Sequence, residues 1–158
     1  GRTMRRLDRA VTDPAALFDI LTRCRVARLG LCRGGVPYVV PMNFACERQD
    51  GRFVFYVHCA GEGQKLDILR ENANVCIEAD CDHALVPGEQ ACSHSFRYAS
   101  VIAQGRAEFL QDAEEKARAL TLLMRWQTGK DIPVTPEQAN TVTVLRIIAE
   151  EITGKRHS

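Results

Sequence analysis

The sequence lacks a long apolar run and lacks a dominant charge of either sign. No apolar segment approaches the roughly 20 residues that a membrane-spanning helix needs, and no signal-peptide pattern follows the first arginines. The 158 residues carry 21 basic and 20 acidic side chains, a net charge of +1. Such a balance produces no strong field toward nucleic acid or an anionic membrane. We therefore expect a cytoplasmic protein that binds neither.

Basic side chains gather only near the start of the chain, at Arg2, Arg5, Arg6 and Arg9. A nucleic-acid-binding arm and a solvated tail both fit this cluster, and the tail is the simpler interpretation. No repeat, linker or low-complexity segment divides the sequence. The length is that of one domain with a sizeable core. We predict a single domain over residues 1–158, with extended tails at 1–10 and 153–158.

The seven cysteines include no Cys-x-x-Cys pair. Their odd number and mostly apolar surroundings favour reduced thiols that act as small hydrophobic residues. Two Cys-x-His pairs, Cys81-Asp-His83 and Cys92-Ser-His94, suggest a structural zinc site as an alternative. They lack the spacing of known zinc-binding motifs, so we predict no metal.

Three segments show the pattern of amphipathic helices. In the first, Asp13 is a good N-cap and Pro14 suits the first helical position. The same segment has apolar residues at helical spacing: Leu17, Ile20, Leu21 and Cys24. The second helix is expected from about residue 64 to 72. The third begins near residue 113 and should end near Thr128-Gly129.

Six segments read as strands, over residues 26–32, 36–46, 53–59, 74–80, 96–110 and 142–148. Short turns at Gly34-Gly35 and Asp50-Gly51 require antiparallel pairing of the early strands. Pro37 and Pro41 interrupt the second strand and should lie at an edge, bulge or bend. The helices are too few for a doubly wound sheet. The pattern predicts a small, mainly β (α+β) antiparallel barrel with helices packed outside it.

A glycine-rich turn lies between the third strand and the second helix. The strand runs through His58 to Gly61 and Gly63, and Lys65 follows in the first turn of the helix. Glycines let backbone N–H groups approach an anion, and a helix N-terminus and a lysine both favour negative charge. The turn therefore suits a phosphate group, although Lys65 could also be an ordinary solvated lysine.

Several motifs in order resemble the FMN-binding split-barrel family related to pyridoxamine 5′-phosphate oxidase, and in particular its nitroimidazole-resistance (Nim-type) branch. They are Met4-Arg-Arg, Gly35-Val-Pro-Tyr-Val-Val-Pro-Met-Asn-Phe44, His58-x-Ala-x-x-Gly-x-Lys65, Ala91-Cys92 with Arg97-Tyr-x-Ser100, and Ile152-Thr-Gly-Lys155. The resemblance implies a six-stranded antiparallel split β-barrel with flanking helices. It also implies a homodimer with FMN at the subunit interface.

The resemblance further implies which residues bind the cofactor. The flavin ring would be flanked by Pro41, Met42, Asn43 and Phe44, and the phosphate would be held by Gly63 and Lys65. The partner subunit would supply Ser95, Tyr98, Ser100 and Trp126. Without the resemblance, Pro41 and Met42 could be a bulge and a core residue, and Trp126 could serve ordinary packing.

His58 is the candidate catalytic residue and a candidate flavin contact. It could form a wall of the flavin site, donate a proton to the reduced substrate, or bind haem or a metal. A histidine that merely hydrogen-bonds to backbone at the barrel mouth also fits.

The function that the resemblance implies is that of an FMN-dependent oxidoreductase. It would take electrons from a small donor such as a reduced nicotinamide and pass them to a small electrophile, such as a nitroaromatic or quinone. Extra arginines that would bind pyridoxamine phosphate are missing, so we do not expect vitamin B6 oxidation. FAD could replace FMN. The alternative is a non-catalytic flavin- or haem-binding sensor, with His58 or His157 as a haem ligand.

Overall fold

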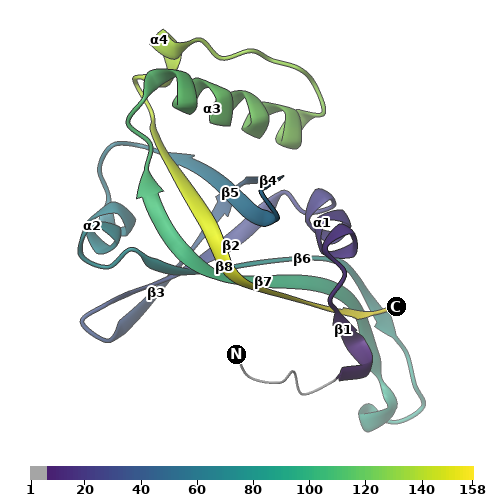
Figure 1. Ribbon diagram of the computed structural model, residues 1–158. Helices are drawn as coiled ribbons and strands as arrows, with labels where there is room; N and C mark the ends of the chain where they lie inside the picture. The colour runs from purple at the N-terminus through teal and green to yellow at the C-terminus, as the bar shows by residue number, and fades with distance from the viewer. Residues whose placement is uncertain (1–6) are drawn as a thin grey trace.

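The computed structural model of the chain describes residues 7–158 (Figure 1). The arginines at positions 2, 5 and 6 and the Met4-Arg-Arg motif therefore lie outside the described residues. The described chain contains eight strands: β1 (Ala10–Val11), β2 (Val26–Arg33), β3 (Val36–Asn43), β4 (Ala45–Gln49), β5 (Arg52–Cys59), β6 (Asn74–Val86), β7 (Ser95–Phe109) and β8 (Thr143–His157). Its helices are η1 (Leu7–Arg9), α1 (Pro14–Thr22), α2 (Gln64–Glu71), η2 (Ala91–Ser93), α3 (Ala113–Thr128) and α4 (Pro136–Ala139).

All eight strands belong to one antiparallel sheet. The order is β3-β2-β6-β7-β8-β5-β4, and β1 pairs with β8 outside this path. The longest ladders join β6 to β7 and β7 to β8. The mainly β class with flanking helices is thus confirmed, and the antiparallel pairing follows from the short hairpin turns.

The six expected strands become eight because one expected strand is divided and a short one is added. The segment 36–46 splits at Phe44, which is completely buried. Before it, β3 pairs with β2, and after it, β4 pairs with β5. The chain therefore turns a corner at Phe44 and changes its pairing partner. Such a corner cannot be read from a continuous β-like pattern.

The C-terminal segment 153–157 is not a tail, contrary to the sequence-based expectation. It is the end of β8, in register with β7 on one side and with β1 on the other, so that Lys155 lies opposite both Ser100 and Ala10. A polar composition predicts a tail, but this part of the strand has one face toward solvent and is held by ladder hydrogen bonds.

The β7–β8 ribbon changes register once, because Gln104 pairs with Glu151 while Gly105 pairs with Ala149. Glu150 is therefore the extra residue of a β-bulge. Gly105 fits this position because a Cβ there would lie 2.3 Å from the carbonyl oxygen of Ile148. The bulge and the missing side chain let the long strands coil around the core.

The helices cover different parts of the sheet. In Figure 1, α3 and α4 lie above it, α1 lies at the right and α2 at the left. Asp13 caps α1 through its side chain, and Gly129 ends α3 with a positive φ of 75°, as expected from the sequence. One apolar core lies inside the sheet beneath α1 and α2, and a second lies between α3 and the β4–β5–β8 side of the sheet. Within residues 7–158, no helix is both long and apolar enough to span a membrane.

Candidate functional site

The N-terminus of α2 is an open helix end. Gly63 occupies the N-cap with φ 149° and offers no side chain to the first-turn amides. The side chains of Asp13, Asp112 and Thr135 cap the other three α-helices. Lys65 is half-buried in this turn, and α2 is anchored from below by Leu66, Ile68 and Leu69. Free amides, a helix dipole and a lysine at one end can bind a phosphate group.

The four predicted ring-flanking residues do not share one environment. Pro41 and Asn43 are exposed on the outer face of β3, which is an end strand of the sheet. Met42 points to the other face and packs against the core. Phe44 is fully buried, with its ring centroid 6.1 Å from that of Phe55. Side chains alternate along a strand, so a run of adjacent residues reaches both faces.

Trp126 packs against residues of its own chain. Its indole Nε1 donates a 2.9 Å hydrogen bond to the carbonyl of Cys24. The ring contacts Phe44 at a centroid distance of 5.6 Å and Phe18 at 5.9 Å. The side chain thus links α3 to α1 and to the corner at Phe44. Its predicted contact with flavin across a subunit interface stays a prediction.

His58 is exposed near the end of β5, where it lines a cavity of about 390 Å³. The other walls come from α3, the segment that follows it, α4 and the residue just before β8: Leu120, Leu123, Met124, Ile132, Pro133, Val134, Gln138 and Val142. Most of these side chains are apolar. The polar residues in the lining are His58 and Gln138.

A larger cavity of about 610 Å³ lies on the far parts of β6 and β7. In Figure 1 these strands extend to the lower right, away from α3 and α4. Two of the predicted site residues, Tyr98 and Ser100, line this cavity, and Ser95 does not. Ser95 instead lies beside His157, with its Oγ 3.5 Å from Nδ1. Within the chain, Tyr98 and Ser100 therefore line a different cavity from His58.

The floor of the larger cavity holds two carboxyl groups that sequence reasoning missed. Glu78 and Asp80 project from the same face of β6, with side chains 31% and 21% exposed. Arg28 Nη1 of β2 lies 3.2 Å from Asp80 Oδ2 and 3.7 Å from Glu78 Oε1. His83 Nε2 contacts the other oxygen of Asp80. Asp80 therefore has a close partner at each oxygen.

The pKa values of the two carboxyl groups are shifted in opposite directions. Burial, together with the neighbouring Asp80 carboxylate, raises the pKa of Glu78 to about 7, and the attraction of Arg28 opposes this shift only in part. The pKa of Asp80 is lowered, chiefly by its hydrogen bond with Glu78 and also by Arg28 and His83, against the effect of burial. Two adjacent carboxyl groups share one proton because both cannot ionise cheaply.

A β-bulge shapes this cavity. Cys81 pairs with Ala99 and Ala84 pairs with Arg97, so Asp82 and His83 together lie opposite Tyr98. Asp82 has φ 61°, an uncommon conformation for a residue with a side chain. Bulges of this kind redirect side chains, here that of His83 toward Asp80.

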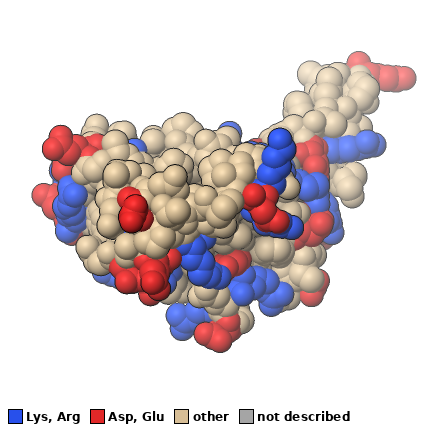
Figure 2. Space-filling model, turned by 90° about the horizontal axis from the view of Figure 1, so that it is seen from above, with Lys and Arg blue, Asp and Glu red and all other residues tan. Residues whose placement is uncertain are grey.

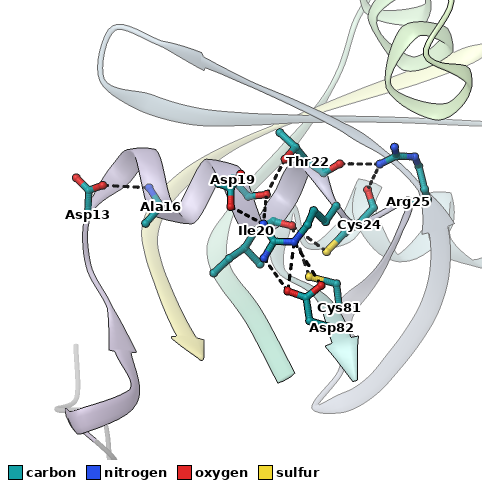
Figure 3. Close-up of polar contacts among 10 residues, drawn as sticks. Asp13, Ala16, Asp19, Ile20, Thr22, Cys24, Arg25, Cys81 and Asp82 are labelled. Carbon is teal, nitrogen blue, oxygen red and sulfur yellow. Dashed lines mark hydrogen bonds and ion pairs between the residues drawn. The ribbon is translucent and has the colours of Figure 1, made fainter. Parts of the chain in front are cut away.

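Arg23, at the end of α1, holds the bulge in place (Figure 3). Its Nη2 lies 2.7 Å from Asp82 Oδ2, and the same guanidinium pairs with Asp19. Two thiols lie beneath it. Cys24 and Cys81 both direct their sulfur atoms at the carbonyl of Ile20, at 3.3 and 3.8 Å. Burial raises the pKa of Cys24 to about 12, so this thiol stays protonated.

The Cys-x-His pairs do not form a metal site in the described chain. Cys81 is buried while His83 is exposed, and His94 Nδ1 lies 2.8 Å from the carbonyl oxygen of Gln90. Among residues 7–158 no group of three or more histidine, cysteine, aspartate or glutamate side chains could hold a metal ion. All seven cysteines are free, but Cys92 is exposed rather than in apolar surroundings.

The face seen from above does not carry charge of one sign. On the face seen from above in Figure 2, lysine and arginine side chains are interspersed with aspartate and glutamate, mostly along its edges. The centre of this view is largely uncharged. This distribution agrees with the net charge of +1.

Comparison with known proteins identifies the family. Residues 13–156 match the family described as pyridoxamine 5′-phosphate oxidase, and the chain belongs to this family. A candidate 5-nitroimidazole antibiotic resistance protein from Bacteroides thetaiotaomicron is 34% identical over 93% of this chain and 86% of that chain, with a TM-score of 0.79. The predicted relation to the nitroimidazole-resistance branch is thus confirmed as a resemblance in sequence and in structure.

Two further structures share the fold at lower identity. The flavocytochrome Anf3 from Azotobacter vinelandii has a TM-score of 0.80 and 24% identity over 99% of this chain and 73% of its own. An FAD-binding protein from Mesorhizobium loti has a TM-score of 0.67 and 24% identity over 95% and 98%. At such identities these likenesses show the fold alone. No curated protein matches the sequence.

Proposed function

We propose that this protein binds FMN and uses it to reduce a small electrophile such as a nitroaromatic or a quinone. The open N-terminus of α2, with Gly63 at the cap and Lys65 half-buried in the first turn, is the observation that carries the proposal. A flavin mononucleotide ends in a phosphate group that suits such a seat. Membership of the family and the flavin-binding names of two structural relatives support the same assignment.

The residues present suit both parts of a flavin, its charged phosphate and its flat ring. The first-turn amides of α2 and Lys65 would hold the phosphate. The exposed edge of β3 at Pro41 and Asn43 would offer backbone donors and acceptors to a flat ring. Bound FMN would supply reversible two-electron chemistry. The chain would supply the anion seat, exclude water and hold protons.

A homodimer forms part of the proposal. The outer face of the sheet exposes the apolar side chains of Val26, Val39 and Ile102 on three of its strands. These residues lie on one face. Ile102 continues the paired row of Pro41, Arg28 and Glu78, and Val26 and Val39 lie two positions along their strands from Arg28 and Pro41. A second copy covering this face would bury them and could bring Tyr98 and Ser100 to its own flavin. Light scattering tests the assembly, and a stable flavin-loaded monomer would contradict it.

The direct test of the cofactor is spectroscopic. The purified protein, or the protein mixed with FMN, is expected to absorb near roughly 450 nm as oxidised flavin does. A reduced nicotinamide should bleach this band, and a nitroaromatic should restore it. Mass analysis of the released ligand distinguishes FMN from FAD. A protein that neither contains nor takes up flavin would refute the proposal.

Lys65→Ala tests the phosphate seat. Loss of a charge-assisted hydrogen bond costs about 1.5–3 kcal/mol, so FMN affinity should fall by about tenfold to a hundredfold. Fluorescence titration measures the affinity. Lys130→Ala, at an exposed lysine after α3, is the matched control and should leave affinity unchanged. Equal affinity for both variants would show that the phosphate binds elsewhere.

A non-catalytic flavin- or haem-binding protein is the second candidate. The observation in its favour is the apolar cavity with His58 in its wall, because haem pockets combine an apolar surface with a histidine ligand. His157 is a poorer candidate, since it is not among the residues that line this cavity. A Soret band lost in His58→Ala would support haem binding. Bound flavin that no donor reduces would support a carrier.

A further inference from the structure

The cavity of about 610 Å³ between β6 and β7 has the composition of a ligand site. Its volume lies within the range of about 300–1,000 Å³ typical of small-molecule pockets. Phe96 and Leu85 line it while remaining 63% and 57% exposed. Exposed aromatic and aliphatic side chains that flank a hollow are expected to pack against a planar apolar molecule.

Most polar groups of this cavity are hydrogen-bond donors. Tyr98 and Ser100 offer hydroxyl groups, and Arg97 offers a guanidinium. The two oxygens of Asp80 are engaged by Arg28 and His83, so this carboxylate has little capacity left for a ligand.

Glu78 differs from Asp80 because the one cationic contact it makes within residues 7–158, with Arg28, is 3.7 Å long. A carboxyl group that carries a proton can donate a hydrogen bond, whereas an ionised one can only accept. Asp80 has the two closer partners, which favour its ionised form, so below about pH 7 we expect the shared proton on Glu78. The cavity therefore presents donors from both of its walls.

We propose that this cavity binds a neutral planar aromatic molecule bearing an acceptor oxygen, and that the Glu78 carboxyl group donates a hydrogen bond to that oxygen. Nitro and quinone oxygens belong to this class. The inference deepens the proposed function, on which it rests for the identity of the electron acceptor. It moves the proton-bearing group near the acceptor from His58 to Glu78.

The groups that face Glu78 set the pH range of this interaction. From β2 and β6 they are Arg28, Asp80 and His83, with Cys76 on the same face of β6. From β7 they are Ile102, which lies directly opposite, and the cavity-lining Ser100, Tyr98 and Arg97. From β8, Lys155 lies beyond Ser100. Burial and Asp80 together raise the pKa of Glu78 to about 7, above its ordinary value.

A neutral acceptor should therefore bind more weakly as the pH rises. With a pKa of about 7, the protonated fraction of Glu78 falls from about nine-tenths at pH 6 to about one-tenth at pH 8. Affinity should fall by up to about tenfold over this range. A cationic aromatic ligand would show the opposite trend, since it prefers the ionised carboxylate.

The experiment uses 4-nitroanisole, which is neutral throughout this range, in NMR titrations of the full chain at pH 6 and pH 8, with and without FMN. 4-Methylanisole lacks the nitro oxygens and serves as the matched ligand. Glu78→Gln keeps a donor but cannot ionise, so binding should persist and become independent of pH. Glu78→Ala should bind several-fold more weakly at pH 6. Glu108→Gln, at a strand glutamate paired with Arg146, should behave as the natural protein.

The outcomes separate this inference from the proposed function. Normal FMN affinity with nitroanisole binding that is independent of pH, or unchanged in both Glu78 variants, would overturn the assignment of the cavity. Preference for benzylamine over nitroanisole would overturn it as well. Failure to bind FMN, with nitroanisole binding that still follows Glu78, would refute the proposed function and leave the cavity assignment standing.

Discussion

Two glutamates on separate strands of the same sheet show how differently one residue type can be held. Glu47 on β4 is 17% exposed and Glu78 on β6 is 31% exposed. Glu47 accepts a hydrogen bond of 2.8 Å from the buried Tyr56 and two from Arg118, at 2.9 and 2.7 Å. Glu78 has a second carboxylate, Asp80, beside it and a cation at 3.7 Å.

The electrostatic consequence is opposite for the two groups. Burial would raise the pKa of Glu47, but hydrogen bonds from Arg118 and Tyr56 outweigh it and hold the pKa below its usual range. For Glu78, burial and Asp80 act in the same direction and raise the pKa. A fully hydrogen-bonded carboxylate stabilises the fold. A carboxyl group that keeps its proton beside a cavity costs stability when ionised and is available for binding.

The largest effect is expected from Glu47→Gln, which removes the charge that satisfies Arg118 and Tyr56. Breaking such a partly buried network should lower the free energy of unfolding by about 2–3 kcal/mol. Chemical denaturation at pH 7 measures it. The loss should be smaller at low pH, because the pKa of Glu47 is lowered and its contribution disappears as the carboxylate is protonated. If Glu47→Gln left the free energy of unfolding unchanged, the contrast between the two glutamates would be lost.

Above pH 7, Glu78→Gln should raise the free energy of unfolding, whereas Glu47→Gln lowers it. Because the pKa of Glu78 is raised in the folded state, its favourable contribution is present below the unfolded pKa and is lost as the pH rises through about 7. The variant should gain about 1–2 kcal/mol relative to the natural protein between pH 5 and pH 8, an effect reduced by solvent and by the opposite shift of Asp80. Denaturation curves at several pH values measure this gain. Parallel pH profiles for the two proteins would contradict it.

The smallest effect concerns the bulge that supports the Glu78 side of the cavity. Asp82→Asn keeps a residue that tolerates positive φ but removes the ion pair with Arg23. It should cost about 0.5–1 kcal/mol. Asp82→Val should cost more, because a β-branched residue is strained at φ 61°. Thermal unfolding measures both, and equal stability of the two variants would mean that the bulge conformation carries no strain.

Much of the fold was accessible from the sequence because its signals are local. The cap at Asp13, the stripe of α1 and the end of α3 at Gly129 depend on residues within a few positions of one another. The corner at Phe44 and the strand over 153–157 were missed, because each depends on which distant strand lies alongside.

The candidate site divides in the same way. The turn from His58 to Lys65 could be recognised because strand, glycines and helix follow one another directly. The pair of Glu78 and Asp80 was missed, although their i, i+2 spacing on a strand placed them on one face. The charges of that pair are set by two contacts that the local pattern does not show. Arg28 lies about fifty positions away in the sequence, and a bulge redirects His83.

The sequence by itself determined the family, the mainly β class and the glycine-rich turn before α2, because these follow from residue order and short-range patterns. Only the tertiary structure decided that Trp126 packs against residues of its own chain, that His58 and Tyr98 line different cavities, and that the pKa of Glu78 is raised. The physical reason is that burial and Coulomb interactions depend on distances between strands, which no single stretch of sequence contains.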